Sequence, residues 1–139
     1  MKNAVKFFFQ FIYTVWVILV WIVNFVTHFF VSMIGAAFIW DRVKREFFCR
    51  SITFYFVRFG FFATGIRALG FGLENVPNDF QFIVVCNHQS LLDVVLFFQV
   101  FPRHVCFFAK RELLRVPILG WDIKLQGHLP VDRSNAKQA

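Results

Sequence analysis

Residues 85–95 read VCNHQSLLDVV and place a histidine and an aspartate, His88 and Asp93, in a polar island within apolar chain. If a buried strand ends near Cys86, His88 lies in the loop at its carboxyl end, where open α/β sheets place their ligands. Ser90 then caps the next helix, and Asp93 completes an S-x-x-D variant of the capping box. Such a turn brings the two side chains together. An aspartate that accepts one imidazole N–H fixes the tautomer and leaves the other ring nitrogen free to act as a base.

The same residues also have a plainer interpretation. Asp93 is then only a residue of a helix terminus, and His88 is a loop histidine without a chemical role; spacing alone favours this interpretation. The sequence contains no G-x-S-x-G nucleophile elbow, so a serine hydrolase is not indicated. A chemically active His–Asp pair would therefore act on the hydroxyl group of a substrate.

The segments around this pair predict the opening of an α/β sheet. Three short runs rich in β-branched and aromatic residues predict strands: 82–86 (FIVVC), 104–109 (HVCFFA) and 128–132 (HLPVD). A helix is predicted from Ser90 to Phe98. Another short helix is predicted within 110–125, broken by Pro117 and Gly120. Strands and helices that alternate at these spacings are typical of α/β folds.

The first part of the chain predicts a membrane segment. Hydrophobic residues make up 58% of the sequence, 23 of them Phe, and no Asp, Glu, Lys or Arg occurs from Phe7 to Trp40. As one helix this run would be ~51 Å long at ~1.5 Å per residue, against roughly 30 Å for the hydrocarbon core of a bilayer. Asn24 or Gly35 is therefore expected to mark a bend, a re-entrant turn or an interfacial end. A cleaved signal peptide is disfavoured, because its apolar core spans only about 7–15 residues.

The net charge of +7 is concentrated around this apolar run. Lys2 and Lys6 precede the run, and a group of cations follows it: Arg42, Lys44, Arg45 and Arg50. Positive residues beside a span favour the cytoplasmic side, so the rest of the chain is expected to face the cytoplasm at the inner membrane. Cations in these positions suit anionic lipid headgroups, and nucleic acid is not an expected partner.

The next segment, 46–72, is aromatic but carries Glu46, Arg50 and Thr53 at helical spacing. It predicts a weakly amphipathic helix that lies on the membrane surface or packs on the first segment. The turn-forming cluster ENVPND at 74–79 predicts a linker. The predicted organisation has three parts: a membrane-embedded helical segment (1–45), an interfacial helix with its linker (46–76) and the first part of an α/β domain (77–139).

Three cysteines, Cys49, Cys86 and Cys106, form no C-x-x-C pair and indicate a reducing compartment instead of a disulfide framework. A metal site is the alternative for two of them, because Cys86-x-His88 and His104-x-Cys106 together offer ligands that zinc accepts. The one-residue gaps are shorter than usual, and cysteines within apolar runs act as small hydrophobic residues. No metal site is predicted.

Three stretches in order resemble the sequence blocks of the glycerolipid acyltransferases, most closely the bacterial 1-acyl-glycerol-3-phosphate acyltransferases. NHQSLLD (87–93) matches the N-H-x-x-x-x-D block, and AKRELLRVPILG (109–120) is similar to a Lys-rich segment that ends in Pro and Gly. GHLPVDR (127–133) resembles the Gly-x-x-x-(Val/Ile)-Asp-Arg block, and an apolar N-terminal membrane segment is also typical of the family. The resemblance implies an α/β acyltransferase domain, incomplete here, behind a membrane helix or helical hairpin.

The resemblance also implies a mechanism. His88 would be the general base that removes the proton from the free hydroxyl of a lysophosphatidate, and Asp93 would orient it. The hydroxyl would attack an acyl thioester of coenzyme A or acyl carrier protein and give phosphatidate without an acyl-enzyme. Arg133 and Lys110 would bind the phosphate of the acceptor, with Arg111 as a further candidate. The thioester is a co-substrate, and no other cofactor and no metal are implied.

One departure from the family pattern affects these expectations. The family's third block, Glu-Gly-Thr-Arg, supplies another glutamate and arginine for the acceptor, and the sequence does not contain it. The chain is therefore expected to be an amino-terminal fragment of a longer enzyme. Two alternatives stay open: an acceptor such as glycerol-3-phosphate or another lysophospholipid, and a non-catalytic membrane anchor.

Overall fold

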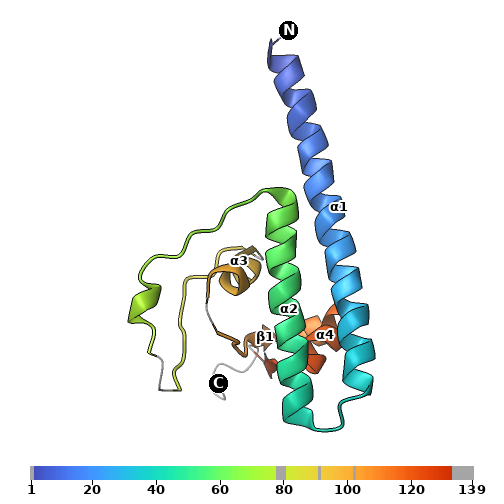
Figure 1. Cartoon of the computed structure of the whole chain (residues 1–139), viewed down its shortest axis with the longest axis vertical. Helices are drawn as coiled ribbons and strands as arrows, with labels where there is room; N and C mark the ends of the chain where they lie inside the picture. Colours follow the sequence, from blue (N-terminus) through green and yellow to red (C-terminus); the bar gives the residue numbers. More distant parts are fainter. Residues whose placement is uncertain (1, 78–80, 91, 102, 133–139) are drawn as a thin grey trace.

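The computed structural model of the chain describes residues 2–77, 81–90, 92–101 and 103–132. Figure 1 shows two long helices side by side as an antiparallel hairpin, with shorter elements packed against it and the N-terminal end of the first helix extending beyond the second. The elements are, in order, α1 (Lys2–Ala37), α2 (Arg42–Thr64), the 3₁₀ helix η1 (Leu73–Asn75), α3 (Leu92–Val100), β1 (Phe108–Lys110), the 3₁₀ helix η2 (Arg111–Arg115), α4 (Leu119–Leu125) and β2 (Leu129–Val131).

Helix α1 is continuous over 36 residues, so a bend or a re-entrant turn at Asn24 or Gly35 is wrong, whereas an interfacial end there stays a prediction. The Asn24 side chain does not interrupt the helix, because its Nδ2 donates to the carbonyl oxygen of Phe56 on α2 at 3.0 Å. At Gly35, the absence of a Cβ lets the ring of Phe48 pack directly against the backbone of α1. Both residues therefore serve helix–helix contact.

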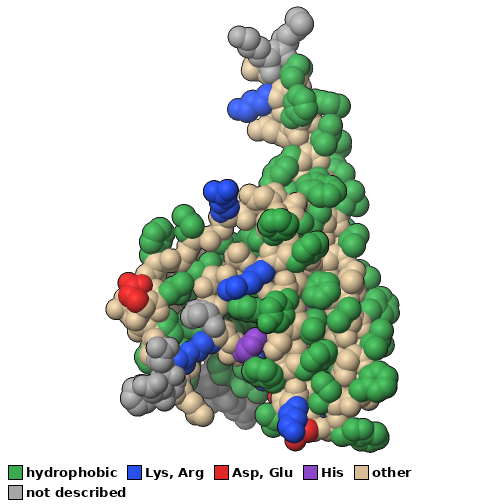
Figure 2. Space-filling model, viewed as in Figure 1, with side chains coloured by type: hydrophobic (Ala, Val, Ile, Leu, Met, Phe, Trp, Pro, Cys, Tyr) green, Lys and Arg blue, Asp and Glu red, His purple; other side chains and the backbone are tan. Residues whose placement is uncertain are grey.

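Helix α1 is long and apolar enough to cross a membrane, and it is the only such helix in the described part of the chain. Most of its large apolar side chains, such as Phe7, Trp16 and Ile34, are exposed in the structure. Figure 2 shows these hydrophobic side chains along the length of the helix. Apolar surface of this extent is unfavourable in water, so α1 suits a lipid environment, as the sequence predicts for this segment.

Helix α2 begins at Arg42, four residues before the segment in which a helix is predicted. The start is set by Asp41, whose side-chain oxygen accepts the backbone N–H of Lys44 at 2.8 Å and caps the helix. The helix ends at Gly65, which adopts the left-handed conformation with φ of 68°. Of the two placements predicted for this helix, packing on the first segment is present in the structure.

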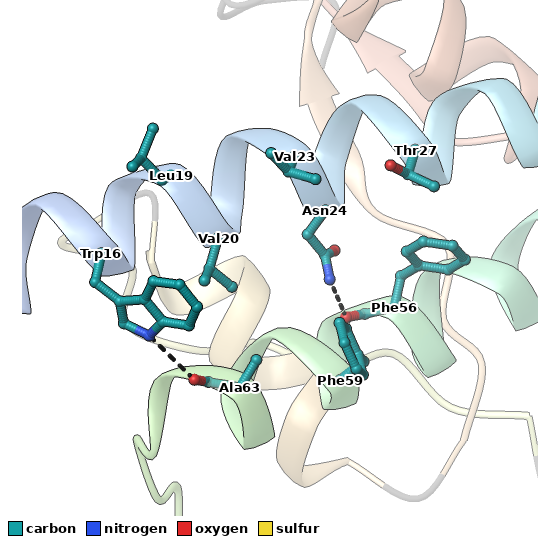
Figure 3. A pocket seen from close by; sticks show the side chains of 9 residues that line it. All are labelled: Trp16, Leu19, Val20, Val23, Asn24, Thr27, Phe56, Phe59 and Ala63. Carbon is teal, nitrogen blue, oxygen red and sulfur yellow. Dashed lines mark hydrogen bonds between the residues drawn. The ribbon is translucent and has the colours of Figure 1, made fainter.

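Side chains of α1 bond the backbone of α2 near its C-terminal end, where helix carbonyls lack intrahelical partners. Tyr13 donates its hydroxyl proton to the carbonyl of Thr64 at 2.8 Å, and Trp16 Nε1 donates to that of Ala63 at 3.2 Å. Figure 3 shows the Trp16 bond, together with that of Asn24, beside an apolar groove between the two helices. The hairpin is therefore held by directed bonds as well as by apolar contact.

The core lies where α3 packs on α2. Val57 and Phe61 of α2 and Phe98 of α3 are buried together, and Trp21 of α1 reaches the same cluster. The rings of Trp21 and Phe61 meet edge to face with centroids 5.3 Å apart, a favourable aromatic geometry. This cluster fixes α3 and the loop before it to the hairpin.

The strands β1 and β2 pair in parallel, with Phe108 opposite Leu129 and Lys110 opposite Val131. They fall at the end of the predicted strand 104–109 and within the predicted strand 128–132, so these two predictions are confirmed in shortened form. Because the strands are parallel, their carboxyl ends lie at the same edge. The described residues contain this one sheet, and helix dominates the structure.

Two sequence predictions near this sheet are wrong. Residues 82–86 form no strand, and Ile83 and Val85 are exposed. Their β-branched composition favours extended backbone, but a strand needs a partner, and β1 and β2 pair with each other. Gly120 does not break the helix predicted within 110–125; it lies in α4, where its missing Cβ admits the backbone of Leu114. The predicted break at Pro117 is confirmed, because η2 and α4 lie on either side of it.

A buried polar cluster joins α4 to the hairpin. His28 Nε2 lies 2.8 Å from Thr53 Oγ1, and the Thr53 hydroxyl donates to the carbonyl of Cys49 at 3.0 Å. Since that hydroxyl has a single proton, His28 Nε2–H must be the donor to Thr53. Asp122 Oδ1 lies 3.9 Å from His28 Nε2, and Asp122 Oδ2 accepts Gln126 Nε2–H at 2.7 Å. Burial raises the pKa of the Asp122 carboxyl to about 6.

The close contact at Gly35 predicts that Gly35→Leu destabilises the hairpin. A larger side chain there overlaps the Phe48 ring, and overpacking of this kind typically costs about 1–3 kcal/mol. Thermal unfolding of the purified protein in detergent, followed by circular dichroism, should show a midpoint lower by several degrees. Ala37→Leu is the matched control, because Ala37 is exposed at the end of the same helix. Equal midpoints for the two variants would contradict the packing described.

The raised pKa of Asp122 predicts a pH-dependent stability. A carboxyl group with a pKa of about 6 in the folded state, above its ordinary 3.8, holds its proton more tightly when folded. Its contribution is therefore present near pH 4 and is lost as the pH rises through 6, by up to roughly 3 kcal/mol. Asp122→Asn should remove this dependence, and its stability relative to the unmodified protein should rise between pH 5 and 7.5 in denaturant titrations. A relative stability that stays constant or falls over this range would contradict the raised pKa of Asp122.

Candidate active site

The contact predicted between His88 and Asp93 is present in the structure. His88 Nδ1 lies 3.1 Å from Asp93 Oδ2. The same carboxylate oxygen accepts the backbone N–H groups of Gln89 at 2.7 Å and Ser90 at 2.8 Å. Ser90 Oγ in turn accepts the N–H of Leu92 at the start of α3, at 3.2 Å. The loop and the first turn of the helix thus satisfy one another as a capping box does.

These bonds determine the charge of Asp93. The backbone N–H of Ser90, followed by that of Gln89, lowers the pKa of the Asp93 carboxyl below its ordinary value, and His88 adds a smaller effect in the same direction. The group is therefore a carboxylate at neutral pH. A carboxylate only accepts hydrogen bonds, so His88 Nδ1 must carry a proton.

The second ring nitrogen of His88 is then available as a proton acceptor. The His88 side chain is 49% exposed and that of Asp93 32% exposed, so a substrate can approach the imidazole. A partly exposed imidazole with one nitrogen held by a carboxylate has the arrangement of a general base. The arrangement is compatible with proton abstraction from a hydroxyl group.

Two of the three predicted phosphate-binding residues, Lys110 and Arg111, lie at the carboxyl edge of the two-stranded sheet. Lys110 ends β1, and its Nζ lies 3.6 Å from Glu112 Oε1. Arg111 Nη1 donates to Asp132 Oδ2 at 3.3 Å, across the ends of β1 and β2. Both cations are exposed. Arg133 lies outside the described residues, so its predicted position beside them stays a prediction.

The structure thus brings the predicted site residues together in two groups. His88 contacts Asp93 in the loop before α3, and Arg111 contacts Asp132 at the sheet edge, with Lys110 beside them. Both groups are exposed at the surface.

Cys106 and His104, two of the residues considered for zinc, make other contacts. Cys106 donates its thiol proton to the carbonyl of Gly127 at 3.0 Å. His104 packs its ring against Phe47 and lies 3.4 Å from Ser51 Oγ. Among the described residues, no group of three or more His, Cys, Asp and Glu side chains is arranged to hold a metal ion.

One partly buried histidine of the GHLPVDR stretch, His128, has a structural role. His128 Nδ1 accepts the backbone N–H of Phe107 at 3.3 Å and so joins the two strands where they begin. Burial lowers the pKa of His128 to about 4, and the ring is neutral near pH 7. The sequence pattern did not single out this residue.

Helix α2 contributes two residues that sequence reasoning did not connect with the site. Arg50 Nη1 donates to the carbonyl of Gln126 at 2.6 Å, and the Glu46 carboxylate lies against Gly127. Their spacing of four residues is visible in the sequence and predicts helical periodicity, but it does not indicate this contact. Nothing local in the sequence indicates a contact with residues so far along the chain.

Comparison with known proteins identifies a family for the part of the chain that contains both groups of site residues. Residues 71–139 match the sequence model of the Acyltransferase family. A 1-acyl-sn-glycerol-3-phosphate acyltransferase of Saccharomyces cerevisiae is 40% identical over 68 residues, which are 49% of this chain and 22% of the yeast protein. The protein of the same name from Helicobacter pylori is 36% identical over 55 residues, 40% of this chain and 23% of that protein.

A 1-acyl-sn-glycerol-3-phosphate acyltransferase of Pseudomonas aeruginosa matches a longer part of the chain. It is 31% identical over 125 residues, which cover 80% of this chain and 47% of the relative. The matched part is thus less than half of each of these three relatives. No solved structure matches the chain. The family match includes the His88–Asp93 pair, both strands and the basic residues at their ends, and through residues 71–139 the chain belongs to the Acyltransferase family.

Proposed function

We propose that the protein transfers a fatty acyl group from a thioester, of coenzyme A or acyl carrier protein, to the free hydroxyl of 1-acyl-glycerol-3-phosphate. The product is phosphatidate. The observation that carries the proposal is the His88–Asp93 contact, an oriented imidazole in a segment of the Acyltransferase family. The acceptor is inferred from relatives named 1-acyl-sn-glycerol-3-phosphate acyltransferases.

In the proposed mechanism His88 Nε2 takes the proton of the acceptor hydroxyl while the hydroxyl oxygen attacks the thioester carbonyl carbon. Asp93 stabilises the imidazolium that forms, because its carboxylate already accepts the Nδ1–H. The tetrahedral intermediate then collapses, and the carbon–sulfur bond breaks. The leaving thiolate takes the proton from His88 Nε2, so the base is restored and the products are an ester and a free thiol.

The acceptor's phosphate would bind at the sheet edge. Lys110 and Arg111 place two positive groups there, and charge-assisted hydrogen bonds to phosphate oxygens are among the stronger ones. Asp132 holds Arg111 at 3.3 Å and would orient its guanidinium. Arg133 follows Asp132 in the sequence and is proposed as the third cation of this site.

The lipid acceptor suggests where the protein acts. Helix α1 has the length and composition of a membrane span, and we infer that it holds the protein at the inner membrane. The cations that follow it, Arg42 to Arg50, favour the cytoplasmic side, so the active site would face the cytoplasm. There it would meet soluble thioesters and a lipid acceptor in the adjacent leaflet.

Substitution of the base predicts a loss of acyl transfer. In the full gene product, His88→Ala should lower kcat by about 10²–10⁴-fold, the usual contribution of a positioned base. Asp93→Asn should also lower it, because the neutral amide oxygen that takes the place of Oδ2 stabilises the imidazolium less than a carboxylate does. Formation of radiolabelled phosphatidate in membranes measures both. Gln89→Ala is the control, since only the backbone of Gln89 contacts Asp93. A His88→Ala protein that keeps a tenth of the original rate would rule out the base.

Substitution of Arg133 by alanine tests the proposed phosphate site. Loss of a charge-assisted contact should raise the acceptor KM about tenfold or more and leave the thioester KM unchanged. Arg133→Lys should be intermediate between the unmodified protein and Arg133→Ala, because lysine keeps the charge but not the paired donors. Steady-state kinetics with lysophosphatidate and thioester varied in turn decide the matter. If only the thioester KM rises, the residue serves the acyl donor.

A further inference from the structure

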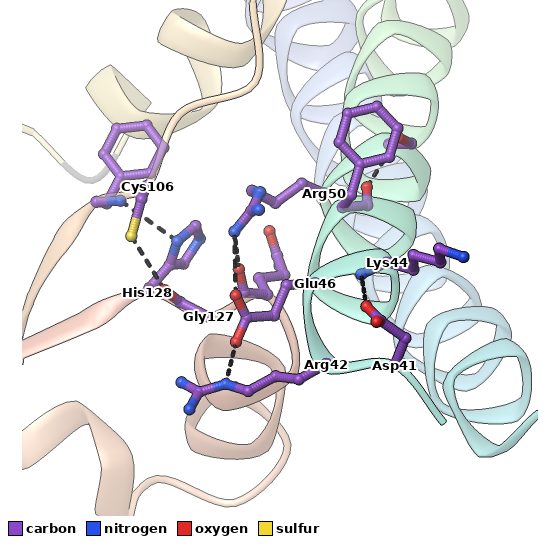
Figure 4. Close-up of polar contacts among 12 residues, drawn as sticks. Asp41, Arg42, Lys44, Glu46, Arg50, Cys106, Gly127 and His128 are labelled. Carbon is purple, nitrogen blue, oxygen red and sulfur yellow. Dashed lines mark hydrogen bonds and ion pairs between the residues drawn. The ribbon is translucent and has the colours of Figure 1, made fainter. Parts of the chain in front are cut away.

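The stretch that leads into β2 is held by helix α2. Residues 126–128, here called the β2 turn, connect α4 to β2. Gly127 adopts φ of 69°, the left-handed region that glycine tolerates. The carboxylate of Glu46 occupies the space that a Cβ on Gly127 would need. A glycine is therefore required here both by the backbone and by the approach of α2, as Figure 4 shows.

The same helix also bonds the β2 turn directly. Arg50 Nη1 donates to the carbonyl oxygen of Gln126 at 2.6 Å, a short charge-assisted hydrogen bond. Glu46 Oε2 lies 3.9 Å from the same guanidinium nitrogen, and Glu46 Oε1 accepts Arg42 Nε–H at 2.8 Å. The Glu46 carboxylate thus steadies Arg50 while contacting the turn itself.

The burial of Glu46 and Arg50 indicates that the pair makes a structural contact and does not only solvate the surface of α2. The side chains of Arg50 and Glu46 are 16% and 18% exposed, whereas that of Arg42 is 80% exposed. Removing two charges from water is costly unless they are paired and hydrogen-bonded. Here the pair is held against an uncharged turn more than seventy residues further along the chain, so its contacts are tertiary ones.

From its other side the β2 turn is bonded to the strand pair. Cys106 donates its thiol proton to the carbonyl of Gly127, and His128 accepts the N–H of Phe107. The N–H of Leu129 then donates to the carbonyl of Phe107 at 2.9 Å. The β2 turn therefore transmits the position of α2 to both strands.

We propose that the Glu46–Arg50 pair is a positioning device that sets the β2 turn, and through it the phosphate-binding edge of the sheet, relative to the hairpin. Strand β2 spans only Leu129–Val131, so a displacement of the turn reaches Asp132 directly. Asp132 contacts Arg111. The consequence for the acceptor rests on the proposed function, whereas the consequence for the β2 turn does not.

The first test follows the β2 turn by hydrogen exchange of the purified protein in detergent. Arg50→Met removes the donor and keeps the length of the side chain, and amides of 126–131 should exchange about tenfold faster, the ratio that corresponds to loss of a charge-assisted bond. Arg50→Lys should restore part of the protection. Lys44→Met is the control, because it removes one charge from the same end of α2 and its side chain points away from the turn in Figure 4. Exchange in 52–62 of α2 should not change in any variant.

The second test separates positioning from general stability by kinetics of acyl transfer. Arg50→Met should raise the KM for lysophosphatidate several-fold and leave the thioester KM unchanged, since the His88–Asp93 loop is bonded within itself. Unchanged exchange at 126–131 would overturn the proposal, as would faster exchange throughout the hairpin or an equal rise of both KM values. If the unmodified protein shows no acyl transfer while Arg50→Met speeds exchange only in the β2 turn, the positioning role is supported and the proposed function is refuted.

Discussion

The antiparallel packing of α2 on α1 is the constraint on which the remaining elements depend. One side of α2 is buried against α1, where Tyr13 and Trp16 bond its last carbonyls. Other parts of α2 receive α3 through Val57 and Phe61, and the β2 turn through Glu46 and Arg50. Both groups of candidate site residues are therefore attached to one helix, and that helix is fixed by α1. A displacement of α2 within the hairpin would alter the position of the His88–Asp93 pair relative to the cations at the sheet edge.

The two groups differ in how they reach their geometry. The His88–Asp93 contact is local: one carboxylate oxygen accepts two backbone N–H groups and the imidazole N–H within a single loop. Its geometry follows from capping of α3. The contact of Arg111 with Asp132 instead depends on pairing of β1 with β2, and that pairing depends on the turn that α2 holds. The His88–Asp93 pair is therefore organised locally, whereas the cations at the sheet edge are organised by tertiary contacts.

This difference explains what could be predicted from the sequence. The His88–Asp93 contact was predictable because its partners lie close together in a capping pattern. A bend or a re-entrant turn, two of the alternatives expected at Asn24 or Gly35, did not occur, and at Asn24 the reason is that the partner of its side chain, the carbonyl of Phe56, belongs to another helix. The strand predicted at 82–86 failed for a similar reason, since composition indicates extended chain but not a partner. The predicted domain boundaries and the role of Arg133 stay predictions.

The polar residues of α1 show that the helix that suits a membrane also binds α2 and α4. Asn24 and His28 lie one helical turn apart on a largely apolar helix, and both are buried. In a bilayer an unsatisfied polar side chain is costly. These two are satisfied only from outside α1, by the Phe56 carbonyl and by the Thr53 hydroxyl of α2. Asp122 of α4 closes the same cluster from the acyltransferase segment. Helix α1 therefore needs α2 in place to satisfy the buried side chains of Asn24 and His28, and α4 packs beside them.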